Sequence, residues 1–160
     1  MKLTIHLDGG SRGNPGPAGA GVIIHDDKNK SVYEAAFFLG PMTNNMAEYT
    51  GLLRALDAAT RLRGSDLHIF SDSELLVRQI NGDYRVKDEK LKPLWEQAQA
   101  KLKALPSWKV EHVRREGNER ADELANTAMD AGEDVIVIDA SPARRRKKSA
   151  ATGGASPATQ

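Results

Sequence analysis

Apolar and polar residues alternate over the first seven positions of the chain, where polar neighbours separate Leu3, Ile5 and Leu7. A period of two is typical of a strand that buries one face. Apolar residues return at 21–25 and at 32–39, on either side of a polar turn. These three segments predict a meander of antiparallel strands.

A helical period begins near residue 45 and predicts a long helix that Gly64 ends. Further along the chain, the pattern predicts a strand, two helices, a strand and a last helix at residues 67–71, 73–80, 90–105, 108–114 and 118–131. Asn118 is expected to cap the last helix, and Gly132 to end it. Strands in a meander followed by strands that helices separate predict an α/β (mixed α+β) fold, with one mixed sheet and helices on its faces.

A segment nearly without side chains joins the first two strands, LDGGSRGNPGPAGAG at residues 7–21. Glycine and proline in such numbers are typical of a surface loop. The flanking strands instead favour a hairpin whose bare backbone lets a ligand approach and whose N–H groups can face phosphate oxygens. Asp8 would lie at the mouth of that site.

Four acidic residues stand where predicted elements begin or end: Asp8, Glu48, Asp72 and Asp122. Strand ends and helix starts of a mixed sheet can converge on one crevice, and carboxylates gathered there favour hard divalent cations. Each acid also has a structural interpretation. Glu48 could complete a capping box with Asn45, Asp72 could cap a helix, and Asp122 could complement a helix dipole.

At 160 residues the chain is long enough for one domain with its own core. It contains no cysteine, which excludes disulfides and thiolate metal sites and fits a reducing compartment. No apolar run reaches the ~20 residues of a membrane span, and the first residues do not resemble a signal peptide. We therefore expect a monomeric cytoplasmic protein that does not bind membranes.

Charge is unevenly distributed along the chain, although the net charge is only +1. Residues 141–160 carry no acidic residue and five basic ones: Arg144, Arg145, Arg146, Lys147 and Lys148. We divide the chain into a catalytic domain, residues 1–133, and a flexible basic tail, residues 134–160. The tail could contact nucleic acid through phosphates, or serve only solubility or localisation.

Four segments occur in the order and spacing typical of type 1 ribonuclease H: LDGGSRGNPGPAGAGV, TNNMAEYTGLLRAL, IFSDSELLVRQING and NERADELAN. The likeness spans about residues 1–132, and the chain looks most like compact members of that family from bacteria and archaea. The resemblance implies a ribonuclease H-like fold with a five-stranded mixed sheet flanked by helices.

The resemblance also implies an endonuclease that cleaves the RNA strand of an RNA–DNA hybrid. In the family, the acids that match Asp8, Glu48, Asp72 and Asp122 hold two divalent ions, Mg²⁺ or Mn²⁺. One ion activates water and the other stabilises the leaving 3′ oxygen, as in other two-metal sites. The products would carry 5′-phosphate and 3′-hydroxyl ends.

Further residues match family positions that contact the two strands of the hybrid. Those expected to contact the RNA strand at its 2′-hydroxyl groups are Gly10, Ser11, Arg12 and Asn14. Those expected to contact the DNA strand and its phosphate are Thr43, Asn44 and Asn45. Short side chains that donate and accept hydrogen bonds suit both tasks.

The sequence departs from many family members in two places. Many family members carry a histidine in the loop before the last acid, where it assists product departure or proton transfer. Here the loop before Asp122 is short and has no histidine. Arg115 or Glu116 is a candidate for that role, beside the simpler interpretation of a solvated turn. The segment after Asp72 lacks the extra basic helix that grips the hybrid in some relatives. We therefore expect weaker hybrid binding, or binding aided by the basic tail.

Two other functions stay open at this point. A hybrid-binding module without catalysis would gain nothing from a cluster of negative charge, which disfavours it. Another nuclease of the same fold, such as a junction resolvase or transposase core, is disfavoured by the GNPG turn and by the TNN motif.

Overall fold

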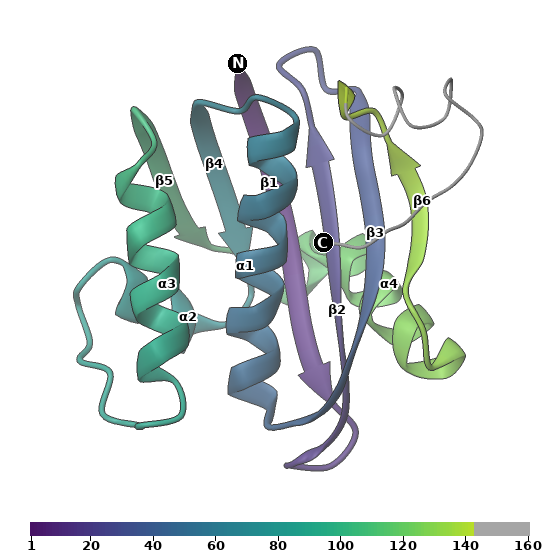
Figure 1. Cartoon of the computed structure of the whole chain (residues 1–160), viewed down its shortest axis with the longest axis vertical. Coiled ribbons are helices and arrows are strands. Elements are labelled where there is room, and N and C mark those ends of the chain that lie inside the picture. The colour runs from purple at the N-terminus through teal and green to yellow at the C-terminus, as the bar shows by residue number, and fades with distance from the viewer. Residues whose placement is uncertain (143–160) are drawn as a thin grey trace.

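A computed structural model describes residues 1–142 and contains one six-stranded sheet (Figure 1). The strands are β1 (Lys2–Ser11), β2 (Gly16–His25), β3 (Ser31–Met42), β4 (Asp66–Ser71), β5 (Ser107–His112) and β6 (Val135–Asp139). Their order across the sheet is β5-β4-β1-β2-β3-β6. The pairs β1–β2, β2–β3 and β3–β6 are antiparallel, whereas β1–β4 and β4–β5 are parallel. The predicted mixed sheet is confirmed.

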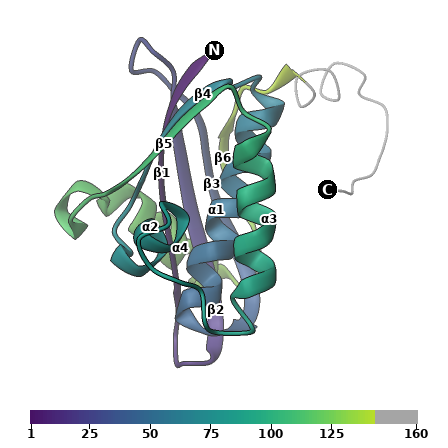
Figure 2. The same ribbon diagram turned by 90° about the vertical axis from the view of Figure 1, so that its left-hand side faces the viewer.

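Helices cover both faces of the sheet (Figure 2). They are α1 (Asn44–Arg61), α2 (Glu74–Ile80), α3 (Lys92–Lys103), the short 3₁₀ turn η1 (Arg115–Gly117) and α4 (Glu119–Ala131). The helices α1 and α3 lie on one face of the sheet and α4 on the other. Gly132 ends α4 in a left-handed conformation with φ of 69°, as the sequence predicted.

The main core fills the space between the sheet and α1. Leu3, Ile5 and Leu7 of β1 are fully buried, as their alternation predicted. On the other face, α4 approaches β2 closely, because a Cβ added at Gly21 would lie 2.0 Å from the carbonyl oxygen of Ala121. The bare backbone of β2 therefore lets the helix that carries Asp122 lie directly on the strand beside β1.

The sixth strand corrects the sequence-based prediction of five. Residues 135–139 fall in the segment that we assigned to the tail, yet β6 pairs with β3 from Tyr33 to Ala36. The run of four apolar residues at 135–138 is too short to distinguish a strand from a loop, and its partner strand lies about a hundred residues earlier. The ordered part of the domain thus extends past residue 133, whereas Arg144 to Lys148 lie outside the described residues.

None of the helices in residues 1–142 combines the length and the apolar composition needed to cross a bilayer.

Candidate active site

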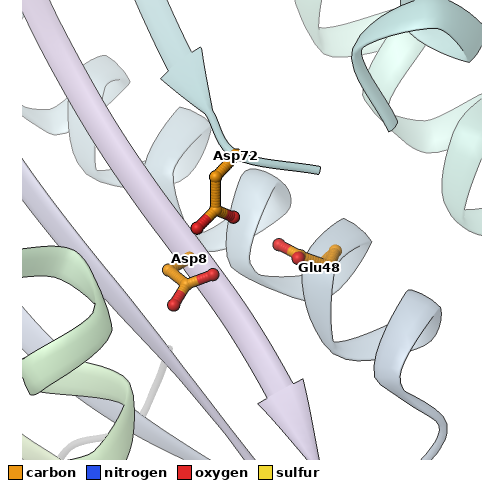
Figure 3. Close-up of side chains that lie close together, drawn as sticks. All are labelled: Asp8, Glu48 and Asp72. Carbon is orange, nitrogen blue, oxygen red and sulfur yellow. The ribbon is translucent and has the colours of Figure 1, made fainter. Parts of the chain in front are cut away.

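Three carboxylates from distant parts of the chain meet at the end of β4 (Figure 3). Asp8 lies on β1, Glu48 on α1, and Asp72 directly after β4, and one oxygen atom of each lies within 4.8 Å of the others. The parallel register of β1 and β4 pairs Leu7 with Ser71, so the next residues of the two strands are the two aspartates. The sheet therefore brings Asp8 beside Asp72, and α1 adds Glu48.

Glu48 points into this cluster instead of capping its own helix. Its Oε1 accepts a hydrogen bond from the backbone N–H of Gly9 at 3.0 Å. The actual cap of α1 is Thr43, whose hydroxyl oxygen accepts from the N–H of Met46 at 3.2 Å. The capping box with Asn45 is therefore absent, and the structural interpretation of Glu48 was wrong.

A close approach of two backbones places Glu48 against β1. A Cβ added at Gly9 would lie 2.4 Å from the carbonyl oxygen of Ala47, so only glycine lets α1 come this near. The alternative interpretation of Asp72 fails as well, because the side chain that caps α2 belongs to Ser73, which accepts from the N–H of Leu76 at 3.2 Å.

Asp122 completes the group from the other face of the sheet. It lies in the first turn of α4 on an exposed position, and its side chain is one of the groups that raise the pKa of Asp8. The structure therefore brings all four predicted acids to one site, with three in a tight cluster and Asp122 at its rim.

Burial and like charges make this cluster unfavourable as a set of bare anions. Asp8 is 8% exposed and Glu48 6% exposed. Burial, with the charges of Glu48 and Asp72 and hydrogen bonds to Asp122 and Asp72, raises the pKa of Asp8 to about 9. Burial and the charge of Asp72 raise the pKa of Glu48 to about 8, although the bond from Gly9 opposes this shift. Bound cations would remove the repulsion, and all-oxygen ligands match Mg²⁺ or Mn²⁺.

The Gly-rich hairpin and the start of α1 form one continuous surface next to the acids. The N–H of Ser11 donates to Oδ1 of Asn44 at 3.2 Å, and the N–H of Asn44 donates to Oδ1 of Asn14 at 3.0 Å. Both amide carbonyls are thus used inside the protein, which leaves the NH₂ groups of the two asparagines for an external acceptor. Asn45 is exposed beside them, and Gly10 is partly exposed.

Arg12 departs from this surface and reaches across to α4. Its Nη2 lies 2.8 Å from Oδ1 of Asp130 and donates to Oδ1 of Asn126 at 3.3 Å. Asn126 in turn donates from Nδ2 to Oδ2 of Asp122 at 3.5 Å. Asn126 was not among the residues predicted from the sequence, although its position four residues after Asp122 on a predicted helix indicates a neighbour.

Asn118 stands at the predicted N-cap position of α4 but does not cap the helix with its side chain. It is 2% exposed, and its Nδ2 donates to the carbonyl oxygen of Leu7 at 2.9 Å. In the described residues its Oδ1 is buried without a hydrogen-bond partner. Because Leu7 precedes Asp8, this bond fastens the start of α4 to the strand that carries the central acid.

The two candidates for the loop role lie between β5 and α4. Arg115 and Glu116 belong to η1 and are exposed. Their chain segment leads into Asn118 through the bond from its N–H to the carbonyl oxygen of Arg115 at 2.9 Å. Both side chains are thus on the solvent side of the turn that precedes Asp122.

Comparison with known proteins gives a consistent family. A family described as reverse transcriptase-like matches residues 6–128. A bifunctional protein of Mycobacterium tuberculosis is 43% identical over 145 residues, which cover 90% of this chain and 40% of that protein. Ribonuclease HI of Halobacterium salinarum is 39% identical over 129 residues, which cover 81% of this chain and 65% of that protein. The chain thus spans about two fifths to two thirds of the length of these relatives.

Solved structures agree with the sequence relatives. The crystal structure of RNase H1 from Halobacterium salinarum has a TM-score of 0.80 at 37% identity. The match covers 82% of this chain and 99% of that protein's chain. LC11-RNase H1 in complex with an RNA/DNA hybrid has a TM-score of 0.77 at 40% identity and covers 81% of this chain and 98% of its own.

Proposed function

The chain belongs to the type 1 ribonuclease H family, and on this basis we propose that it is an endonuclease that hydrolyses the RNA strand of RNA–DNA hybrids. The reaction would use two divalent metal ions, Mg²⁺ or Mn²⁺, and leave 5′-phosphate and 3′-hydroxyl ends. The hybrid bound to the related LC11 enzyme supports the substrate class.

One observation carries the proposal: Asp8, Glu48 and Asp72 gather their oxygens within 4.8 Å in a largely buried place. Such a group costs several kcal/mol of folding free energy when its members are ionised and unpaired. A module that only binds a polyanion gains nothing from clustered carboxylates, whereas a metal-dependent nuclease needs them to hold its ions.

The four acids would divide the work of holding metal. Glu48 is oriented by its bond from Gly9, and Asp8 is central because Glu48, Asp72 and Asp122 all act on its pKa. When bound, the ions supply a nucleophilic water and neutralise the leaving oxygen. The chain's own contribution is to fix these oxygens before the substrate arrives, so that little reorganisation remains.

Hybrid recognition would use the surface formed by the hairpin and the start of α1. The outward NH₂ groups of Asn14 and Asn44, with the backbone at Gly10 and Ser11, suit 2′-hydroxyl and phosphate oxygens. Thr43 and Asn45 extend this surface along α1 toward the DNA strand. Arg12 would add a cation at the rim.

Other parts of the proposal depend on the sequence alone. Arg115 or Glu116 would assist product departure in place of the histidine of other family members. The basic residues from Arg144 to Lys148 would add phosphate contacts, and the enzyme would act as a cytoplasmic monomer.

Cleavage assays on four duplexes test the proposal. Labelled RNA–DNA, RNA–RNA and DNA–DNA duplexes, and a hybrid with a short deoxyribonucleotide run around one scissile bond, are incubated with Mg²⁺, Mn²⁺ or EDTA. We expect cuts in the RNA of the hybrid, with a metal ion present, and protection of the substituted bond. Binding of the hybrid without cleavage in either metal would favour the non-catalytic module, and cleavage of DNA–DNA would favour another nuclease of this fold.

A further inference from the structure

A chain of polar contacts leads from the Gly-rich hairpin to the fourth acid of the site. Asn126 lies one helical turn beyond Asp122 on α4, and its Nδ2 is 3.1 Å from the carbonyl oxygen and 3.5 Å from Oδ2 of Asp122. Its Oδ1 accepts from Nη2 of Arg12 at 3.3 Å. The same guanidinium nitrogen is 2.8 Å from Oδ1 of Asp130.

The chemistry of Arg12 fixes which way the Asn126 amide is turned. A guanidinium only donates hydrogen bonds, so Asn126 must present its carbonyl oxygen to Arg12. The NH₂ group is then left facing Asp122, which is an acceptor when ionised. The carbonyl oxygen of Asp122, 3.1 Å from the same Nδ2, favours this orientation as well.

We infer that Asn126 is a positioning residue for Asp122 and that Arg12 links its orientation to the hairpin. The inference rests on the proposed function, because it assigns Asp122 a role in the metal site. The contact between Arg12 and Asn126 is not a local contact within a helix, because the two residues are 114 positions apart in sequence.

The exposure of these side chains separates positioning from stability. The side chains of Arg12 and Asp130 are 47% and 70% exposed, and ion pairs of this kind contribute little to folding. The carboxylate of Asp122 is exposed, and Asn126 is the side-chain amide that donates a hydrogen bond to it, so the orientation of this carboxylate depends on Asn126. Changes at Asn126 should therefore alter the site without unfolding the protein.

The same contacts imply that substrate competes for Arg12. A phosphate of the hybrid and the carboxylate of Asp130 are both acceptors for one exposed guanidinium. Asp130 would hold Arg12 over Asn126 in the free enzyme, and the hybrid would draw it outward. Removal of Asp130 should therefore favour hybrid binding while loosening the hold on Asn126.

Four variants test the inference in the full chain: Asn126→Ala, Asn126→Asp, Asp130→Asn and the control Arg120→Gln. Arg120 also lies on α4, but its Nη2 pairs with Oε1 of Glu34 at 2.7 Å on β3. Arg120 also pairs with Glu123 at 3.0 Å, so the control removes two ion pairs of the same helix that involve neither Asn126 nor Arg12. Asn126→Asp keeps the shape of the side chain and replaces the NH₂ group with an oxygen that repels Asp122.

The readouts are kcat and KM on the hybrid, Mn²⁺ binding by calorimetry without substrate, and Tm. For Asn126→Ala we expect kcat to fall about tenfold, which corresponds to about 1.4 kcal/mol, with KM within twofold and Tm within a few degrees of wild type. Asn126→Asp should fall further in kcat, and both variants should bind Mn²⁺ several-fold more weakly. Asp130→Asn should lower KM.

Failure of the inference and failure of the proposed function give different results. If wild type cleaves the hybrid and Asn126→Ala matches Arg120→Gln in kcat and in Mn²⁺ affinity, the positioning role is wrong and the function stands. If wild type does not cleave, the proposed function fails, and the Mn²⁺ titrations still decide the role of Asn126. An Asn126→Ala variant that only melts at a lower temperature would show a structural role and overturn the inference.

Discussion

Replacing Asp8 by asparagine should stabilise the metal-free protein while abolishing cleavage. The substitution keeps the size of a side chain that is 8% exposed, and it removes one charge from a group whose oxygens lie within 4.8 Å of one another. At that separation, two full charges repel by about 3 kcal/mol if the effective dielectric constant is about 20. The stabilisation should therefore be large enough to measure in a melting experiment.

The pKa of Asp8 sets the pH dependence of this effect. Its folded value of about 9 exceeds its value of about 4 in the unfolded chain, so unfolding near neutral pH releases a proton. The contribution of Asp8 to stability is complete below pH ~4 and is lost as the pH rises through ~9. The difference between Asp8→Asn and wild type should thus be near zero at pH 4 and largest near pH 9.

The size of the effect at pH 7 follows from the linkage relation. At pH 7, three pH units above the unfolded pKa, the variant should exceed wild type in free energy of unfolding by at most ~4 kcal/mol. Coupling with Glu48 reduces this difference to about 2 kcal/mol. For a domain of this size, that raises Tm by roughly 6–8 °C. Saturating Mg²⁺ should stabilise wild type more than the variant and reduce the difference.

Thermal melts followed by circular dichroism at pH 5, 7 and 9, in EDTA and in Mg²⁺, measure these differences. Asp57→Asn is the control, because Asp57 is about half exposed, pairs with Lys101 at 2.8 Å, and lies nine residues beyond Glu48 on α1 without belonging to the carboxylate cluster. It should change Tm by no more than ~3 °C, without a trend above pH 5. A variant at Asp8 that melts below wild type in EDTA at pH 9, or whose gain does not grow with pH, would refute the reasoning.

Three further predictions concern other parts of the chain. Asp72→Asn should lower kcat on the hybrid by at least about a hundredfold and leave the circular dichroism spectrum unchanged, because it removes a proposed metal ligand and no core contact. Ending the chain after Glu133 should lower the free energy of unfolding in urea by about 2–4 kcal/mol, because β6 pairs with β3 and Val135 packs on a buried cluster; an unchanged midpoint would contradict this. Deleting residues 143–160 removes five cations, so the slope of log K for hybrid binding against log salt should become shallower by up to ~4–5 units, with kcat unchanged. Equal slopes would show that these residues make no phosphate contacts.

Local patterns along the chain were sufficient to predict the order of the main elements up to α4 and to single out the four acids. Alternation identified the buried face of β1, a helical period identified α1, and Gly132 marked the end of α4. The end of α1 was predicted at Gly64, but the residue that turns left-handed there is Arg63, with φ of 64°. Asp72 could be placed at a strand end because strand ends follow from the same periodicity. Asp8 was also expected to end its strand, but β1 continues to Ser11 because the glycines that follow Asp8 still pair with β2. The resemblance to ribonuclease H then indicated which of the acids belong together.

The tertiary structure alone decided which partner each polar group takes. Glu48, Asp72 and Asn118 were equally consistent with helix capping, because capping depends on sequence spacing that all three satisfy. The register of β1 on β4 and the close approach of α1 at Gly9 instead turn Glu48 toward the other acids. Packing of α4 on β2 turns Asn118 toward Leu7.

The sixth strand and the contact of Arg12 with Asn126 have the same physical origin. Each joins residues about a hundred positions apart, and nothing in the local sequence of either partner specifies the other. Such pairs form because the sheet order brings β6 beside β3 and the hairpin beside α4. Periodicity is a property of neighbouring residues, whereas these contacts depend on which elements the folded core places side by side.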